Sequence, residues 1–121
     1  MALNVTGFSS ASLDYKAFHD TAVVNTMVGN VTGSSGRLYH LQLDNTAAGT
    51  AVYYKIYFDA DKATSDDPDL KIYVAGSTQE ILEIPSGIAF TQLSYFVTTT
   101  NATSGSQAAS STVVKLYGVT S

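Results

Sequence analysis

The chain has 121 residues, of which 45% are hydrophobic and only 13% charged, and its net charge is −4. This length suits a single domain with its own core, and the hydrophobic share excludes a disordered chain. The acidic balance and six scattered basic residues argue against nucleic-acid binding, which needs clustered Lys and Arg. No cysteine is present, which excludes disulfides, thiolate metal sites and a Cys nucleophile.

Residues 1–10 lack the basic and apolar regions of a signal peptide. No stretch approaches the ~18 apolar residues that a membrane-spanning helix needs. We therefore expect a protein that is used without secretion and has no membrane partner.

The first twenty residues are the least regular part of the chain. Residues 3–5 could begin a short strand. Phe8, Tyr15 and Phe18 are large apolar side chains whose spacing has no clear period of a strand or a helix. We interpret residues 1–20 as an N-terminal arm that packs on its own domain or on a neighbouring copy. In this interpretation Phe8, Tyr15 and Phe18 are partner-docking residues. The alternative is a helical turn over Ser12–Asp20 with Ser12 as its cap.

Residues 21–121 are predicted to form the folded domain. Thr21–Val28 is a short apolar run that suits a strand, and Gly29–Gly36 is rich in turn-forming residues. Arg37–Asp44 shows the alternation of a strand with two different faces. Three of its residues share one face: Tyr39, Leu41 and Leu43.

Asn45–Thr50 is predicted to be a turn, in which Gly49 is the residue suited to a positive φ. Ala51–Asp59 is predicted to be the next strand. Its core face carries Val52, Tyr54, Ile56 and Phe58. Its other face, which we expect to be solvated or interfacial, carries Tyr53, Lys55 and Tyr57. We take Tyr53 and Tyr57 as further partner-docking residues.

The acidic loop that follows is the best candidate for a metal site. It holds five carboxylates: Asp59, Asp61, Asp66, Asp67 and Asp69. A Ca²⁺ ion takes several oxygen ligands from one loop, but Lys62 and Ala63 break the usual alternating spacing. A solvated loop that protects a sheet edge explains the pattern as well, and we predict no metal.

The rest of the chain continues with short strands and turns. Strands are predicted over Leu70–Val74, Thr78–Ile84, Ile88–Phe90, Leu93–Thr100 and Ser111–Gly118, with a turn at Pro85–Gly87 and a polar loop at Asn101–Ser110. In the first of these strands Leu70, Ile72 and Val74 are expected to point inward, and in the last Val113 and Tyr117 lie opposite Val114 and Leu116. Seven or eight short strands without a helix of ordinary length predict an all-β chain. We expect a single antiparallel β-sandwich, jelly-roll or immunoglobulin-like in topology.

No constellation of residues indicates catalysis. The two histidines, His19 and His40, lie in separate segments, and no G-x-S-x-G motif is present. Glu80 and Glu83 are three residues apart, so on a strand they face opposite sides and cannot act as a carboxylate pair. The sequence therefore predicts a non-enzymatic protein without a cofactor.

From Gly36 onward the layout of strands and turns resembles small structural proteins of tailed bacteriophages. The resemblance rests on these elements: Gly36–Asn45, Tyr53–Ala60, Asp66–Asp69, Leu70–Val74, Pro85–Phe90, Val97–Thr100 and Val113–Gly118. It covers about 85 residues, leaves residues 1–35 unmatched, and carries over no functional residue.

The resemblance implies a bacteriophage virion structural protein, most directly a capsid decoration (cement) protein that stabilises the head shell. Its partners would be the major capsid protein and copies of itself, as a homotrimer, in a virion assembled in the host cytoplasm. The alternative is a tail, fibre or head-protrusion module that binds another virion protein, or a host glycan through exposed tyrosines.

Overall fold

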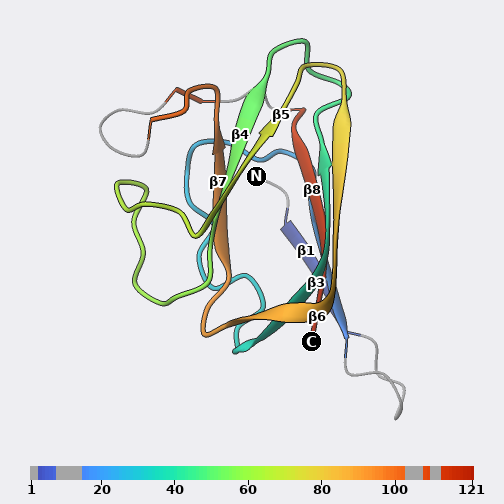
Figure 1. Cartoon of the computed structure of the whole chain (residues 1–121), viewed down its shortest axis with the longest axis vertical. Helices are drawn as coiled ribbons and strands as arrows, with labels where there is room; N and C mark the ends of the chain where they lie inside the picture. The colour runs from blue at the N-terminus through green and yellow to red at the C-terminus, as the bar shows by residue number, and fades with distance from the viewer. Residues whose placement is uncertain (1–2, 8–14, 103–107, 110–112) are drawn as a thin grey trace.

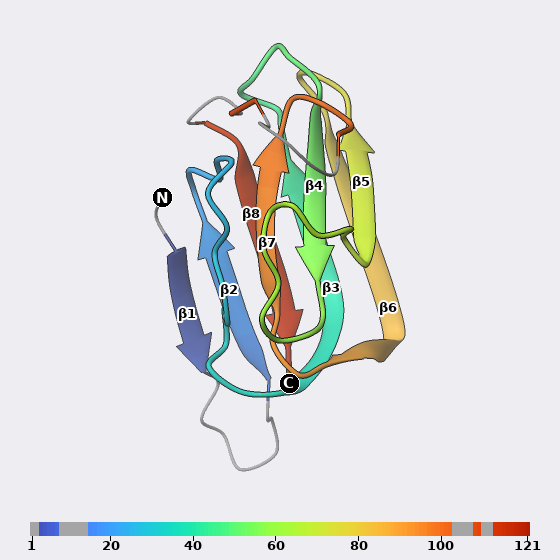
Figure 2. The same ribbon diagram turned by 90° about the vertical axis from the view of Figure 1, so that its left-hand side faces the viewer.

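A computed structural model describes residues 3–7, 15–102, 108–109 and 113–121. These residues contain no helix and eight strands: β1 (Leu3–Gly7), β2 (Lys16–Asp20), β3 (Gly36–Asp44), β4 (Val52–Tyr57), β5 (Leu70–Val74), β6 (Gln79–Phe90), β7 (Ser94–Thr98) and β8 (Lys115–Thr120). The strands form two antiparallel sheets, in the orders β1-β2-β8-β3-β6 and β5-β4-β7. Figures 1 and 2 show the two sheets as facing layers, which confirms the predicted all-β, sandwich-like architecture.

The hydrophobic core lies between the two sheets. The larger sheet supplies Phe18, Leu41 and Leu43, and the smaller sheet supplies Tyr54 and Tyr95, all at most 1% exposed. Period-two alternation explains which side chains of each strand enter the core, because every second side chain of a strand points to the same face. Each of these side chains contributes about 1.5–3 kcal/mol by its burial.

Residues 3–7 and 16–20 belong to the larger sheet. Lys16–Asp20 pairs with Leu3–Gly7 on one side and with Lys115–Thr120 on the other. The short strand expected near residue 3 is confirmed, whereas the helical turn is wrong for the described residues 16–20. Strand β2 lies between β1 and β8 within one sheet, so the described residues of the predicted arm pack on their own domain, and the division at residue 20 stays a prediction.

Thr21–Val28 is not a regular strand. It forms one bridge, between Val28 and Tyr95, where each backbone N–H donates to the other residue's carbonyl at 2.8 and 3.0 Å. The Val97 N–H donates to the Val24 carbonyl at 3.0 Å, and the bends at residues 25–26 interrupt the ladder between these contacts. The segment thus runs antiparallel beside β7 as a rudimentary strand.

A bulge in the β3–β6 pair overturns two further expectations. The register shifts between Leu38 and His40, while β6 continues without a turn through Pro85, Ser86 and Gly87. Gly87 takes a φ of 72°, which suits a glycine in a bulge. Tyr39 lies opposite four residues of β6, Ile84–Gly87, and it is the one extra residue of β3 in the β3–β8 pair. This irregularity turns Tyr39 out of the core, and Leu38 instead joins Leu41 and Leu43 as fully buried.

The outer face of β4 is covered, contrary to the expectation that it would be open. Lys55 and Tyr57 are both 0% exposed. The Tyr57 hydroxyl donates to the Asp66 carbonyl at 2.7 Å, and the Lys55 ammonium donates to the Ala102 carbonyl. Two loops therefore fold over this face, an arrangement that a strand pattern alone does not reveal.

Candidate partner-docking site

Edge strand β5 of the smaller sheet lies opposite edge strand β6 of the larger sheet along one side of the molecule (Figure 2). A cavity of about 340 Å³ lies on this side, and we call it the β5–β6 hollow. It is lined by Leu43, Leu70, Ile72, Tyr73, Glu80, Ile81 and Leu82. Apolar side chains predominate in this set, so the hollow suits an apolar occupant.

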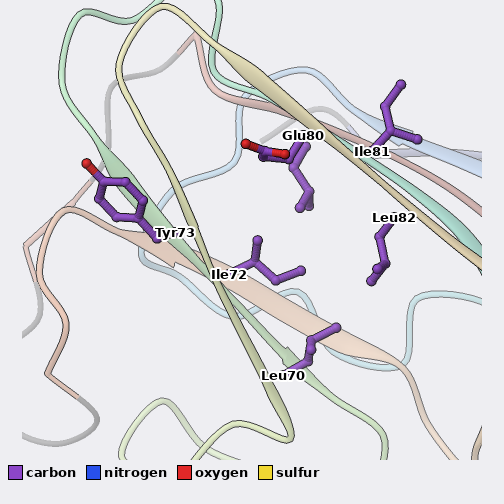
Figure 3. A pocket seen from close by; sticks show the side chains of 7 residues that line it. Leu70, Ile72, Tyr73, Glu80, Ile81 and Leu82 are labelled. Carbon is purple, nitrogen blue, oxygen red and sulfur yellow. The ribbon is translucent and has the colours of Figure 1, made fainter.

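The walls of the hollow are aliphatic, and its rim consists of Tyr73 on β5 and Ile81 on β6, whose side chains lie on the outer faces of these two strands. Figure 3 shows Leu70 and Ile72 from β5 opposite Leu82 from β6, whereas Ile81 points away from the hollow. Tyr73 and Ile81 are each 55% exposed, which is unusual for apolar groups of this size. Such a combination of an apolar cavity and exposed apolar rim is typical of a protein-docking surface.

The register of β6 explains which side chains enter the hollow. Glu80 pairs with Leu43 and Leu82 pairs with Leu41, so Glu80 and Leu82 lie on the inner face of the larger sheet. Ile81 pairs with Gln42 and lies on the outer face. Glu80 is thus a carboxylate on the inner face at the sheet edge, and among the described residues it has no hydrogen bond or ion pair.

Both strands that border the hollow have one free edge. In the described part of the chain, β5 pairs only with β4, and β6 pairs only with β3. A free edge presents a row of backbone N–H and C=O groups that another strand can bind. The site can therefore hold an extended segment through its backbone and accept that segment's apolar side chains.

The docking residues expected near the N-terminus do not form one surface. Phe8 lies outside the described residues. Tyr15 is 41% exposed and contacts Tyr39 edge to face, with ring centroids 5.5 Å apart. Phe18 is buried in the core, where its ring stacks on Tyr95, so it is not accessible to a partner in this fold. A docking role for Tyr15 stays a prediction.

The two docking residues expected on β4 also differ from each other. Tyr53 is half-buried and contacts Tyr73 edge to face, with ring centroids 5.4 Å apart. Tyr57 is enclosed, and its burial, reinforced by the carboxylates of the acidic loop, raises its pKa to about 12. Tyr53 thus lies beside the rim of the hollow, and its docking role stays a prediction, whereas Tyr57 stabilises the loop above it.

Two of the five carboxylates of the acidic loop accept backbone hydrogen bonds. Asp66 accepts from the Ala63 N–H and Asp69 accepts from the Phe58 N–H, both at 2.8 Å. No group of three or more metal-ligating side chains occurs among the residues described by the structure. These bonds explain the loop by local turn chemistry, as in other Asp-rich turns.

The histidines and the glutamates are separated, as their spacing predicts. His19 stacks on Tyr117 with ring centroids 3.8 Å apart, and His40 Nδ1 lies 2.7 Å from a Glu83 carboxylate oxygen. Glu83 pairs with His40 on the outer face, whereas Glu80 lies on the inner face. The prediction that the two glutamates face opposite sides is confirmed.

Sequence reasoning placed Leu70 and Ile72 on an inner face but did not identify the hollow. The missed signal lies in Thr78–Ile84, where the charged residue Glu80 and the apolar residue Leu82 occupy successive positions of the inner face. A charge on the inner face of a strand marks a position at an open edge, since a closed core would not accept it.

Comparisons with known proteins found no match: no family model, no curated protein and no solved structure is similar to this chain. A long apolar helix capable of crossing a membrane is not found among the described residues.

Proposed function

We propose that this protein is a non-enzymatic structural protein that acts by docking on other proteins. The observation that carries the proposal is the β5–β6 hollow, with two free strand edges and the exposed rim residues Tyr73 and Ile81. An apolar cavity beside free edges binds a protein segment more readily than it performs chemistry, because it provides backbone hydrogen bonds and apolar burial.

Within this proposal the topology is a jelly roll. In an eight-stranded jelly roll the first strand pairs with the last one, and the eight strands divide between two four-stranded sheets. Strand β2 takes the place of the first strand here, because β1 lies outside the eight. Here the order β2-β8-β3-β6 supports one such sheet, and β5-β4-β7 with the rudimentary strand beside β7 supports the other. Strand β1 extends the first sheet. The position of β8 between β2 and β3 favours this topology over an immunoglobulin-like one.

The more specific proposal is a bacteriophage capsid decoration protein, which would bind the major capsid protein and copies of itself as a homotrimer in the virion. The sequence resemblance from Gly36 onward supports it, and so does the jelly-roll order, which viral capsid domains use. A ligand that binds only the assembled shell shifts the equilibrium toward that shell, so docking alone would stabilise the particle.

The copy number per particle tests the proposal. In purified virions, quantitative mass spectrometry would measure this protein relative to the major capsid protein. Hundreds of copies per particle would support a decoration protein on the shell. Absence from particles would contradict the virion assignment.

The alternative is a tail, fibre or head-protrusion module that binds another virion protein or a host glycan. The Tyr53–Tyr73 pair favours it, because the exposed Tyr73 ring and the half-buried Tyr53 ring beside it can stack on a sugar. A dozen copies per particle, together with loss of glycan binding in Tyr73→Ala on a glycan array, would support this alternative.

A further inference from the structure

We propose that the β5–β6 hollow binds an extended segment of a partner protein in which two apolar residues are followed by Lys or Arg. This inference rests on the proposed docking function and specifies the chemistry of the partner. The segment adds to the free edge of β6 as an antiparallel strand. Its cation then lies beside Glu80, and one of its apolar side chains enters the hollow beside Leu82.

The positions of the side chains follow from the period of a strand. A strand added to β6 places its own residues opposite Glu80, Ile81 and Leu82, and opposite residues share a face. The residues opposite Glu80 and Leu82 therefore point inward, over the hollow, whereas the residue opposite Ile81 points outward. Antiparallel pairing makes the apolar residue opposite Leu82 the first of the three along the partner chain.

Charge complementarity selects the cation. Glu80 lines the hollow, and the described residues provide it with no ion pair. The nearest strand across the opening carries Lys71, but its ammonium donates to the Asn101 carbonyl at 3.3 Å on the other side of β5. The whole chain carries a net charge of −4, so its field also favours a basic segment.

The free edge selects an extended peptide over a small cationic ligand. Strand β6 has twelve residues and one edge that is unpaired in the described part of the chain. Only a peptide backbone can satisfy such a row of donors and acceptors along its length. The outward contact with Ile81, which is 55% exposed, would bury further apolar area.

The partner is a different protein rather than a second copy. The chain contains two runs of two apolar or aromatic residues followed by Lys, at Tyr53–Lys55 and Val113–Lys115. Lys55 is buried in β4, which is paired on both sides. Lys115 begins β8, which is also paired on both sides. Neither run can leave its sheet without unfolding the donor molecule.

A designed peptide tests the inference. The probe has the sequence Thr-Ser-Thr-Ile-Val-Lys-Thr-Ser-Thr, and its control replaces Lys by Glu. In amide ¹H–¹⁵N NMR titrations of the full chain, we expect shifts confined to β5 and β6 with the Lys peptide. We expect the Glu peptide to bind about 1.5- to fivefold more weakly, the range of an exposed charge pair.

Two variants separate the specific contact from a general attraction. Glu80→Lys should reverse the preference, so that the Glu peptide binds more tightly than the Lys peptide. Glu83→Gln, which removes a carboxylate from the outer face of the same strand, should leave the preference unchanged. The dispersion of the amide spectrum verifies that each variant is folded. Glu80→Gln is a milder variant, to which the Lys peptide and the Glu peptide should bind with equal affinity.

Any of three titration results would overturn the inference, and a fourth result without peptide would do so too. The three are no shifts with the Lys peptide, shifts outside β5 and β6, and a peptide preference that Glu80→Lys does not alter. Shifts in β6 that depend on protein concentration without peptide would also overturn it, because a second copy would then occupy the edge. A failed titration together with hundreds of copies per virion would reject this inference and leave the proposed function in place. Absence from virions together with a successful titration would reject the virion assignment and leave this inference in place.

Discussion

The Asp20 side chain links the two sheets. It is 0% exposed, its Oδ1 accepts from the Ala22 N–H at 3.0 Å, and its Oδ2 accepts from the Tyr95 hydroxyl at 2.5 Å. Strand β2 carries the carboxylate and β7 carries the tyrosine, so the bond crosses the core. Burial and this hydrogen bond both raise the pKa of Tyr95. A buried carboxylate that is satisfied in this way specifies how the sheets face each other.

We expect Tyr95→Phe to destabilise the protein by about 1–3 kcal/mol, because it leaves one oxygen of the buried Asp20 carboxyl group without its donor. Urea unfolding followed by circular dichroism measures the loss. The matched control is Tyr73→Phe, since Tyr73 is 55% exposed and its hydroxyl is solvated. Equal stability of Tyr95→Phe and the native chain would contradict a stabilising role for the bond.

Three buried tyrosines predict a loss of stability at alkaline pH. Burial raises the pKa of Tyr54 and Tyr95, and it raises that of Tyr57 to about 12. Below pH ~10 the tyrosines keep their protons in both states, so their contribution is fully present. Above pH ~10 these tyrosines ionise only in the unfolded state, so the free energy of unfolding falls by up to about 1.4 kcal/mol per pH unit for each tyrosine. The fall ends where the tyrosine ionises in the folded state as well.

Burial lowers the pKa of Lys55, with a smaller contribution from Lys71, so the contribution of this group to stability rises with pH up to the ordinary lysine pKa of ~10.5, where the tyrosine range begins. The comparison of Tyr57→Phe with the native chain removes this effect, because both retain Lys55. We expect the variant to lose less stability between pH 10 and about 12. Parallel stability curves for the two proteins, measured by urea unfolding, would contradict the assignment.

At the scale of elements, the bulge in the β3–β6 pair determines the shape of the larger sheet. Arg37 Nη1 donates to the carbonyls of Ser86 and Gly87 at 3.1 and 3.2 Å, which holds the bulged part of β6 against β3. A Cβ on Gly87 would lie 2.7 Å from Tyr39 Cε1, and its φ of 72° disfavours other residues. The bulge therefore requires glycine for two separate reasons.

We expect Gly87→Ala to cost about 1–3 kcal/mol, because the added methyl group meets both the strained backbone and the Tyr39 ring. Thermal and urea unfolding measure the change. Gly49→Ala is the matched control: a Cβ there has nothing within 4 Å, and its φ is not positive, contrary to the sequence expectation. Gly49→Ala should be neutral or slightly stabilising. Equal losses in both variants would show that the bulge does not need glycine.

At the scale of the whole molecule, the N-terminal strands complete the sandwich. The ring of Phe18 occupies the space beside Gly118, where any Cβ would collide with it, so β2 and β8 fit together only with glycine at that position. Phe18 also stacks on Tyr95 of the opposite sheet. The residues first interpreted as an arm thus supply part of the core.

We expect deletion of residues 1–20 to abolish cooperative unfolding. Loss of a buried phenylalanine alone costs about 3–5 kcal/mol, a large part of the ~5–15 kcal/mol that stabilises a typical domain. Deletion of residues 1–15, which retains Phe18 and Asp20, should leave a folded protein. Near-ultraviolet circular dichroism and urea unfolding show which of the two deletion variants is folded. Cooperative unfolding of the longer deletion would restore the interpretation of residues 1–20 as a separate arm.

The sequence by itself determined the strand character and several of the faces. Val114 and Leu116 are buried while Val113 and Tyr117 are 39% and 40% exposed, as alternation predicted, because the period of a strand is a local property of the backbone. The inner position of Ile72 and the opposite faces of Glu80 and Glu83 follow from the same local rule.

The tertiary structure alone decided what depends on contacts between distant segments. The pairing of β2 with β8, the bulge that turns Tyr39 outward and the loops that bury Lys55 and Tyr57 all join residues far apart in the chain. The β5–β6 hollow belongs to this group, since it exists only where the edges of two different sheets meet. A period-two pattern shows that a strand has two faces, whereas only the folded chain determines what covers each of them.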